Sequence, residues 1–423
     1  MGARGNRNAT AWARRRVALT TGLAVALLAG AGCIPQPPDD AFYRPAARST
    51  AARPGDLLAA QPSRFTLDPV TLNPVPGVRS WKVRYRSTSA TGAASDVSGT
   101  VLVPTTPWAG TGSRPLVTYG VGTRGVGDAC APSKTLAIGT DYEGGVIAEA
   151  LQRGWAVAVS DMAGLGTPGV HTYEVGREQG TALLDIARAA EHLDGTGLDA
   201  TTPVGIWGYS QGGTSAGWAA ELAAMYAPEL RIAGTAAGGV PADLRAVAAN
   251  LDGNAFFSLL GLAAIGYDAA YPDLDLQRYL NASGRQLVAQ NTDFCIVSLP
   301  GIISFLTLSG HHIGEYFTST NPLTTPEWIA RLDENRLGTD APSAPVLLQH
   351  GLFDEVIPRS QALTLRSSWC RQGAAVTWGD LLGEHAIGIL LSIQPALDFL
   401  SARFAGVPAP GNCGAPILGA PPG

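Results

Sequence analysis

Short apolar runs alternate with helical segments along this chain of 423 residues, and this alternation limits its fold more than any other feature. Runs rich in β-branched and aromatic residues predict strands, and apolar residues at helical spacing predict helices. The expected strands cover 81–85, 97–103, 115–120, 155–160, 204–207, 232–236, 345–349 and 375–378. The expected helices cover 143–153, 178–193, 214–226, 360–372 and 387–404. Such alternation predicts a mostly parallel sheet with helices on both faces.

The alternation stops between residue 241 and about residue 340. This segment shows helical and irregular patterns but no clear strand, and it is as long as a small domain. We therefore expect an α/β core in two parts, residues 75–240 and 341–423, the second with a C-terminal tail. A mainly helical cap over 241–340 is expected between them.

The N-terminus has the pattern of an export signal. Three arginines at 14–16 precede an apolar run over 17–29 that is short for a membrane span. A small-x-small pattern at 29–31 fits a leader peptidase site, so residues 1–32 are interpreted as an export signal rather than an apolar core helix. Residues 33–74 are expected to be a linker and N-terminal extension, because 34–40 is rich in Pro, Gln and Asp.

Cys33 follows Gly-Ala-Gly, which resembles the site where bacterial lipoproteins are cut and acylated. Cys33 is therefore a candidate lipidation site, and the protein is expected to be secreted or anchored through it. The remaining cysteines are Cys130, Cys295, Cys370 and Cys413. An exported protein can form disulfides, and four cysteines allow three pairings.

Charge and cysteine spacing exclude two classes of partner. The formal net charge is −5 and no basic run occurs in the body of the chain, which argues against a nucleic-acid partner. No cysteines have metal-ligand spacing such as C-x-x-C, so no metal site is expected.

The pattern G-x-S-x-G occurs twice, around Ser210 and around Ser215. A nucleophilic serine at a strand-to-helix elbow needs a strand directly before it and a helix directly after it. Only Ser210 has such a strand, at 204–207. The flanking glycines allow close packing at a strained turn, and the N–H of Gln211 at the helix start can donate to an oxyanion.

A serine hydroxyl needs a neighbouring base. In the strand-elbow folds the order along the chain is serine, acid, histidine, which leaves four candidates: His311, His312, His350 and His385. His385 lies after the strand at 375–378 and before the last helix, where the base belongs. His350 ends a strand and is expected to face the sheet. The pair His311 and His312 lies in the inserted segment, where a surface or lid role is expected.

Asp354 follows the strand at 345–349 and a turn, which is the expected place for the acid that holds the imidazole tautomer. Glu355 and Asp380 are nearby alternatives. A second oxyanion donor is expected from the Gly-rich loop 120–125, with the N–H of Thr123 or of a neighbour as the candidate. Asp161, at the end of another strand, is interpreted as structural.

Together these motifs resemble the secretory lipases of the lipase A type, found in fungi and actinobacteria. The resemblance covers about residues 115–413. It rests on DACAPS at 128–133, GYSQGG at 208–213, YAPEL at 226–230, DEVIP at 354–358 and EH at 384–385. It implies an α/β-hydrolase core with a helical cap inserted between the core halves, no cofactor, and hydrolysis of triacylglycerols and simpler esters.

The resemblance also implies the disulfides Cys130–Cys295 and Cys370–Cys413, with Cys33 left alone. One departure is visible in the sequence. The family often carries a His or Asp in the oxyanion loop, where this chain has Val121 and Thr123-Arg124.

The predicted function is therefore an exported serine hydrolase that cleaves lipid or small-molecule acyl esters through Ser210, with contact to a lipid interface as a further expectation. An acyltransferase or a peptidase on the same scaffold, and a non-catalytic binding protein of this fold, are the alternatives, because a fold does not fix function. Two apolar stretches of the inserted segment, 255–265 and 295–308, are expected to pack on the core or to line an acyl pocket.

Overall fold

The computed structural model of the chain describes residues 41–44, 52–409 and 411–417. The expected export signal, residues 1–32, and the candidate lipidation site Cys33 lie outside the described residues.

Nine strands form one sheet in the order β1-β2-β3-β5-β4-β6-β7-β8-β9. The strands are β1 (Leu57–Ser63), β2 (Val78–Thr88), β3 (Ala94–Pro104), β4 (Leu116–Gly120), β5 (Ala156–Ser160), β6 (Pro203–Tyr209), β7 (Arg231–Gly238), β8 (Val346–Gly351) and β9 (Val376–Leu381). The pairs from β1 to β3, and β3 with β5, are antiparallel, and all pairs from β5 to β9 are parallel. The predicted mostly parallel sheet with the α/β-hydrolase architecture is confirmed.

Within the expected linker and N-terminal extension, residues 57–63 form a strand that the sequence did not predict. This segment is β1, an edge strand paired antiparallel with β2 from Ser63↔Ser80 to Leu57↔Tyr85. Its composition hides it, because Gln61 and Pro62 interrupt the apolar pattern. Proline is tolerated there because an edge strand has one side without ladder partners.

The helices divide into a core set and a cap set. The core helices are α2 (Pro132–Ile138), α3 (Gly144–Gln152), α4 (Gly176–Glu191), α5 (Gln211–Tyr226), α11 (Arg359–Arg371) and α12 (His385–Phe404). The cap helices are α6 (Leu244–Leu251), α7 (Phe257–Ala270), α8 (Ala282–Gln290), α9 (Leu299–Leu308) and α10 (Pro326–Glu334). Short 3-10 turns are η1 (Ala41–Tyr43), η2 (Asp128–Cys130), η3 (Pro272–Leu274), η4 (Leu276–Arg278), η5 (Ile313–Glu315) and η6 (Pro322–Thr324). α2 was not expected from the sequence, and it begins with a proline at a position where a missing N–H costs nothing.

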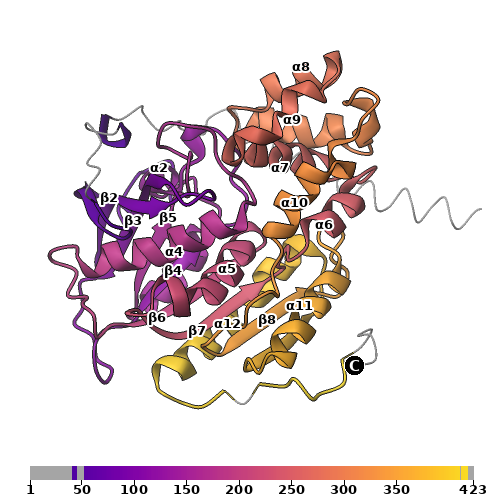
Figure 1. Ribbon diagram of the computed structural model, residues 1–423. Helices are drawn as coiled ribbons and strands as arrows, with labels where there is room; N and C mark the ends of the chain where they lie inside the picture. Colours follow the sequence, from indigo (N-terminus) through magenta and orange to yellow (C-terminus); the bar gives the residue numbers. More distant parts are fainter. Residues whose placement is uncertain (1–40, 45–51, 410, 418–423) are drawn as a thin grey trace, which may run out of the picture.

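The sheet separates two layers of helices. α4, α5 and α11 cover one face, where Leu183 and Trp369 join strand residues in one buried cluster. α3 and α12 cover the other face, where Ile147 and Leu397 belong to a second cluster. Figure 1 shows α4 and α5 crossing in front of the strands.

The segment between β7 and β8 carries the five cap helices and no strand, and the structure describes all of it. In Figure 1, α7, α8, α9 and α10 gather beyond one end of the sheet. The cap has its own buried cluster, which includes Trp328 and Leu251 and also Val356 and Ile357 from the loop after β8. The cap therefore packs directly on the loop that carries Asp354.

Two disulfides join distant segments. Cys130 in η2 is bonded to Cys295 in the cap, and Cys370 in α11 is bonded to Cys413 in the C-terminal tail. These are the pairings that the family resemblance implies.

The double variant Cys370→Ser, Cys413→Ser is expected to lower the free energy of unfolding by about 2–4 kcal/mol, because the bridge restricts the unfolded chain. Ester hydrolysis should stay near wild type, since Asn412 still ties the tail to β9 through its hydrogen bonds with Trp378. Denaturant unfolding followed by circular dichroism measures the difference. Unchanged stability, or crossed pairings in a non-reducing peptide map, would contradict the expectation.

Candidate active site

The candidate site lies at the carboxyl end of the parallel strands. Ser210 directly follows β6, Asp354 follows β8 by three residues, and His385 is the first residue of α12, after β9. Because the carboxyl ends of parallel strands meet at one edge, these residues come together although they are far apart in sequence. The last helix begins two residues earlier than expected, so His385 lies on the helix rather than in the loop before it.

Hydrogen bonds connect the three side chains in series. Ser210 Oγ lies 2.9 Å from His385 Nε2, and His385 Nδ1 lies 2.8 Å from Asp354 Oδ2. The three side chains are therefore within hydrogen-bond reach, as expected of a nucleophile, a base and an orienting acid.

The backbone at Ser210 is strained. Its φ is 59° and its ψ is −122°, in a region that residues with side chains seldom adopt. A Cβ on Gly208 would lie 2.1 Å from the carbonyl oxygen of Gly212, and a Cβ on Gly212 would lie 2.0 Å from that of Gly120. Glycine is therefore required on both sides of the elbow, as the motif predicts.

Ser215 lies away from this site. Its side chain is buried on α5, and its Oγ donates hydrogen bonds to Gln179 Oε1 and to the carbonyl of Gln211, both at 2.9 Å. It contacts neither His385 nor Asp354, so the second G-x-S-x-G match has a structural role.

Asp354 is held as a carboxylate. Its side chain is fully buried, and Oδ1 accepts hydrogen bonds from the backbone N–H groups of Val356 at 3.1 Å and Ile357 at 2.8 Å. Burial alone would raise the pKa of Asp354, but the hydrogen bond from His385 and the neighbouring His350 hold it below its usual range. The carboxylate of Asp354 is therefore ionised at neutral pH.

Two residues that the sequence placed elsewhere or as alternatives, His350 and Glu355, contact the predicted triad residues. His350 is buried with its Nε2 3.0 Å from the Ile357 carbonyl and 3.5 Å from Asp354 Oδ2, and burial lowers its pKa. Glu355 accepts a hydrogen bond from the backbone N–H of His385 at 3.0 Å. Asp380 instead pairs with Arg359 at 2.6 Å, away from the triad. Glu355 is adjacent in sequence to Asp354, and this adjacency was the only signal for its contact.

Gln211 begins α5, where the first backbone N–H groups have no partner within the helix. Its side-chain Nε2 lies 2.9 Å from His171 Nε2, and His171 Nδ1 lies 2.9 Å from the Ala163 carbonyl. Burial lowers the pKa of His171 to about 4, so the ring is neutral and donates to Ala163 from Nδ1. The hydrogen bond to His171 thus holds Gln211, the residue after Ser210, in place.

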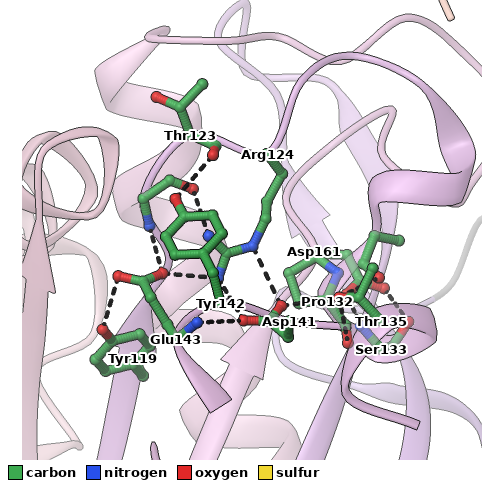
Figure 2. A network of polar contacts seen from close by, with 12 residues as sticks. Tyr119, Thr123, Arg124, Pro132, Ser133, Thr135, Asp141, Tyr142, Glu143 and Asp161 are labelled. Atoms are coloured by element: carbon green, nitrogen blue, oxygen red, sulfur yellow. Dashed lines mark hydrogen bonds and ion pairs between the residues drawn. The ribbon is translucent and has the colours of Figure 1, made fainter. Parts of the chain in front are cut away.

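The Gly-rich loop after β4 forms the other side of the site. Thr123 lines a pocket together with Ser210 and His385. Figure 2 shows the polar network under this loop, in which Arg124 forms ion pairs with Asp141 at 2.8 Å and with Glu143 at 2.7 Å.

Asp161 lies at the right of Figure 2, beside Ser133. It accepts hydrogen bonds from Ser98 Oγ at 2.6 Å and from the backbone N–H of Ser133 at 2.7 Å. Burial raises its pKa to about 6. These contacts anchor the start of α2 to the sheet and agree with a structural role.

Two apolar pockets reach Ser210. The first extends under the cap and includes Leu244, Leu260, Tyr267 and Trp328, with Glu174 as its charged residue. The second lies between α9 and α12 and includes Phe256, Phe305 and Ile389. Sequence reasoning identified the apolar stretches of the cap, and the structure shows which of their residues face these pockets.

The cap histidines make local contacts. His311 Nδ1 lies 2.8 Å from Glu315, and His312 Nδ1 lies 3.4 Å from Asp252. Across the described residues, no three His, Cys, Asp or Glu side chains are grouped so that they could hold a metal ion.

The family described as secretory lipase matches residues 130–412, which include the elbow, Asp354 and His385. This chain belongs to the secretory lipase family. A probable inactive lipase of Mycobacterium tuberculosis is 33% identical over 388 residues, 88% of this chain and 83% of that protein. A secreted triacylglycerol lipase of Malassezia furfur is 29% identical over 412 residues, 92% of this chain and 84% of that protein. The family that the motifs resemble is thereby confirmed.

Solved structures have the same fold as this chain. Candida antarctica lipase A superposes with a TM-score of 0.79 at 25% identity, covering 92% of this chain and 90% of that one. The rice cell wall degrading esterase of Xanthomonas oryzae shares the fold, with a TM-score of 0.66 at 22% identity over 84% of this chain and 100% of that one.

Proposed function

We propose that this chain is an exported, active ester hydrolase, a lipase or carboxylesterase that works through an acyl-enzyme on Ser210. The observation that carries the proposal is the unbroken series of hydrogen bonds from Ser210 through His385 to Asp354. One relative is described as a probable inactive lipase, so family membership alone does not establish activity. The intact triad favours catalysis over a non-catalytic binding role.

The proposed reaction uses each residue for one task. Ser210 Oγ attacks the ester carbonyl carbon while its proton passes to His385 Nε2, and Asp354 stabilises the imidazolium. The oxyanion accepts hydrogen bonds from the N–H groups of Gln211 and Thr123. The carbon–oxygen bond to the alcohol then breaks, and His385 returns the proton to the leaving alcohol. A water molecule deprotonated by His385 next attacks the acyl carbon, the bond to Ser210 Oγ breaks, and His385 returns the proton to Ser210 Oγ as the carboxylic acid is released.

Apolar surface near Ser210 supports a lipid ester as the substrate. Both pockets at the nucleophile are mainly apolar, as an acyl chain requires. Large apolar side chains are also exposed on α9 and on the first turns of α12, the helices that border the second pocket. They are Leu299, Ile303, Leu306, Ile387, Leu390 and Leu391. We propose that this exposed set contacts a lipid surface, since scattered solvent-exposed leucines are common but a group beside a pocket marks a binding site.

A panel of esters graded by acyl length, hydrolysed by purified protein, tests the proposal. Phe305→Asp is expected to lower kcat/KM for palmitate esters by about tenfold or more and for butyrate esters by less, because a charge in an apolar pocket is costly and a long chain fills more of it. Phe305 lines the second pocket, so the effect should grow with chain length.

Leu306→Asp is the matched control. Leu306 is the next residue on α9 and is 59% exposed. It should leave soluble esters of every length near wild type and weaken only the hydrolysis of emulsified triacylglycerol. If Phe305→Asp reduced all chain lengths equally, with circular dichroism unchanged, the cap would be scaffold and not pocket.

A further inference from the structure

We infer that Glu143 is a positioning residue, which holds the second oxyanion donor, the N–H of Thr123, in place from beneath the loop 120–125. The inference rests on the proposed function and goes beyond it, because Glu143 lies outside the triad and is fully buried behind the loop.

Glu143 connects three parts of the core. Its Oε1 accepts a hydrogen bond from Tyr119 OH at 3.0 Å, at the end of β4. Its Oε2 accepts hydrogen bonds from the backbone N–H of Gly122 at 2.9 Å and from Arg124 Nη2 at 2.7 Å. Glu143 itself stands at the start of α3. The Glu143 carboxylate thus connects the loop 120–125 to strand β4 and to the start of helix α3. Figure 2 shows Glu143 between Tyr119 and Arg124.

The contact with Gly122 narrows the choice of oxyanion donor. The Gly122 N–H already donates to Glu143 and is directed away from substrate. The next amide, that of Thr123, has no acceptor within the described part of the chain, and Thr123 lines the pocket that contains Ser210 and His385. A free amide therefore belongs to a residue that lines the same pocket as Ser210.

Thr123 is also held on two other sides. Tyr142 OH donates to the Thr123 carbonyl at 2.8 Å, and Tyr173 OH lies 2.8 Å from Thr123 Oγ1. Arg124 stacks over the Tyr142 ring, 3.9 Å from its centroid. Arg124 Nη1 also donates to the Gly122 carbonyl at 3.4 Å, in the same peptide as the Thr123 N–H. The backbone on both sides of the Thr123 N–H is therefore held by hydrogen bonds.

The buried charges around Arg124 suit a network that positions the loop better than one that stabilises the fold. Two carboxylates, those of Asp141 and Glu143, are buried with one guanidinium, that of Arg124, and each side chain is 3% exposed or less. Burying ions costs desolvation free energy that their attraction often only offsets, so apolar residues of similar volume would stabilise the core as well. A buried ionic network beside an oxyanion loop instead fixes geometry, and a preorganised donor needs fixed geometry.

Glu143→Ala is expected to lower kcat by about 10²-fold, the usual effect of losing one oxyanion donor, with KM changed less than about threefold. The Ki of a trifluoromethyl ketone, which forms a tetrahedral oxyanion adduct on the serine, should rise by the same factor as kcat falls. Glu143→Gln should restore most of the activity, because its amide oxygen can accept from Gly122 and Arg124 while its NH₂ donates to Tyr119 OH.

Tyr142→Phe provides a milder test that removes one hydroxyl and keeps the ring under Arg124. It should lower kcat and weaken ketone binding in parallel by about three- to tenfold, because Thr123 loses one of its hydrogen bonds. This variant keeps the inference testable if Glu143→Ala does not fold.

Asp185→Ala is the matched control for loss of a buried carboxylate. Asp185 is fully buried, bonds Ser87 and Tyr226, and lies on α4, on the other side of the sheet from α3. It should lower the melting temperature and leave kcat and the ketone Ki unchanged.

The outcomes separate the two proposals. If the wild type hydrolyses esters and the Glu143 and Tyr142 variants change only the melting temperature, the positioning role is refuted while the proposed function stands. If the wild type hydrolyses no ester and binds no ketone, the proposed function fails and the positioning role fails with it.

Discussion

Ser210→Ala is expected to abolish ester hydrolysis, lowering kcat by about 10⁴-fold or more, as loss of a triad nucleophile usually does. Ser210 is the serine at the strained elbow, 2.9 Å from His385 Nε2. Steady-state kinetics on a butyrate ester, with circular dichroism to check folding, measures the loss.

Ser215→Ala is the matched control, because it removes the same hydroxyl from the other G-x-S-x-G sequence. It should keep kcat near wild type and cost about 1 kcal/mol of stability through the lost hydrogen bond to Gln179. Near-normal turnover by Ser210→Ala, or an equal loss in both variants, would contradict the assignment of the nucleophile.

Asp354→Asn is expected to lower kcat by about 10³- to 10⁴-fold without changing the shape of the site. An Asn at 354 keeps one oxygen for the N–H groups of Val356 and Ile357 and turns its NH₂ toward His385 Nδ1. The imidazole proton then sits on Nε2, which can no longer accept the proton of Ser210.

Glu355→Gln is the control for Asp354→Asn. Glu355 contacts His385 only through the backbone N–H, and a glutamine oxygen can accept that hydrogen bond too. A loss of less than about tenfold is expected, since no proton-carrying atom of the imidazole is affected. Equal losses in the two variants, or the reverse order, would show that the acid is misassigned.

The three residues of the proposed triad could be predicted from the sequence because each has a local context. Ser210 lies between a strand and a helix, and Asp354 and His385 each follow a strand of the parallel part of the sheet. In a parallel sheet, this position after a strand brings the residues to one edge. The fold could be predicted for the same reason, since strands and helices alternate with clear periodicity.

Features that depend on contacts between distant segments could not be predicted. Strand β1 is stabilised by its pairing with β2, and strand propensity is a weak guide when a segment contains Gln61 and Pro62. The contact of His350 with Asp354 depends on which way a side chain points at the end of β8. Periodicity does not record this direction.

The polar network under the loop 120–125 could not be predicted from the sequence either. Arg124 reaches Glu143 across 19 residues through side-chain atoms alone. The sequence showed only that Val121 and Thr123-Arg124 stand where the family often carries a His or an Asp. The structure gives a physical reason for Arg124 at this position. Arg124 is paired with Asp141 and Glu143 and does not line the pocket, whereas Thr123 lines it together with Ser210.

The central claim is that this member of the secretory lipase family is active through Ser210, and covalent labelling tests it most directly. The purified protein is treated with a fluorophosphonate, which reacts with an activated serine hydroxyl, and the modified residue is located by peptide mass spectrometry. The account predicts one stoichiometric adduct on Ser210, which is absent from Ser210→Ala and strongly slowed in His385→Ala. A folded protein with no adduct, or with an adduct on Ser215, would contradict it.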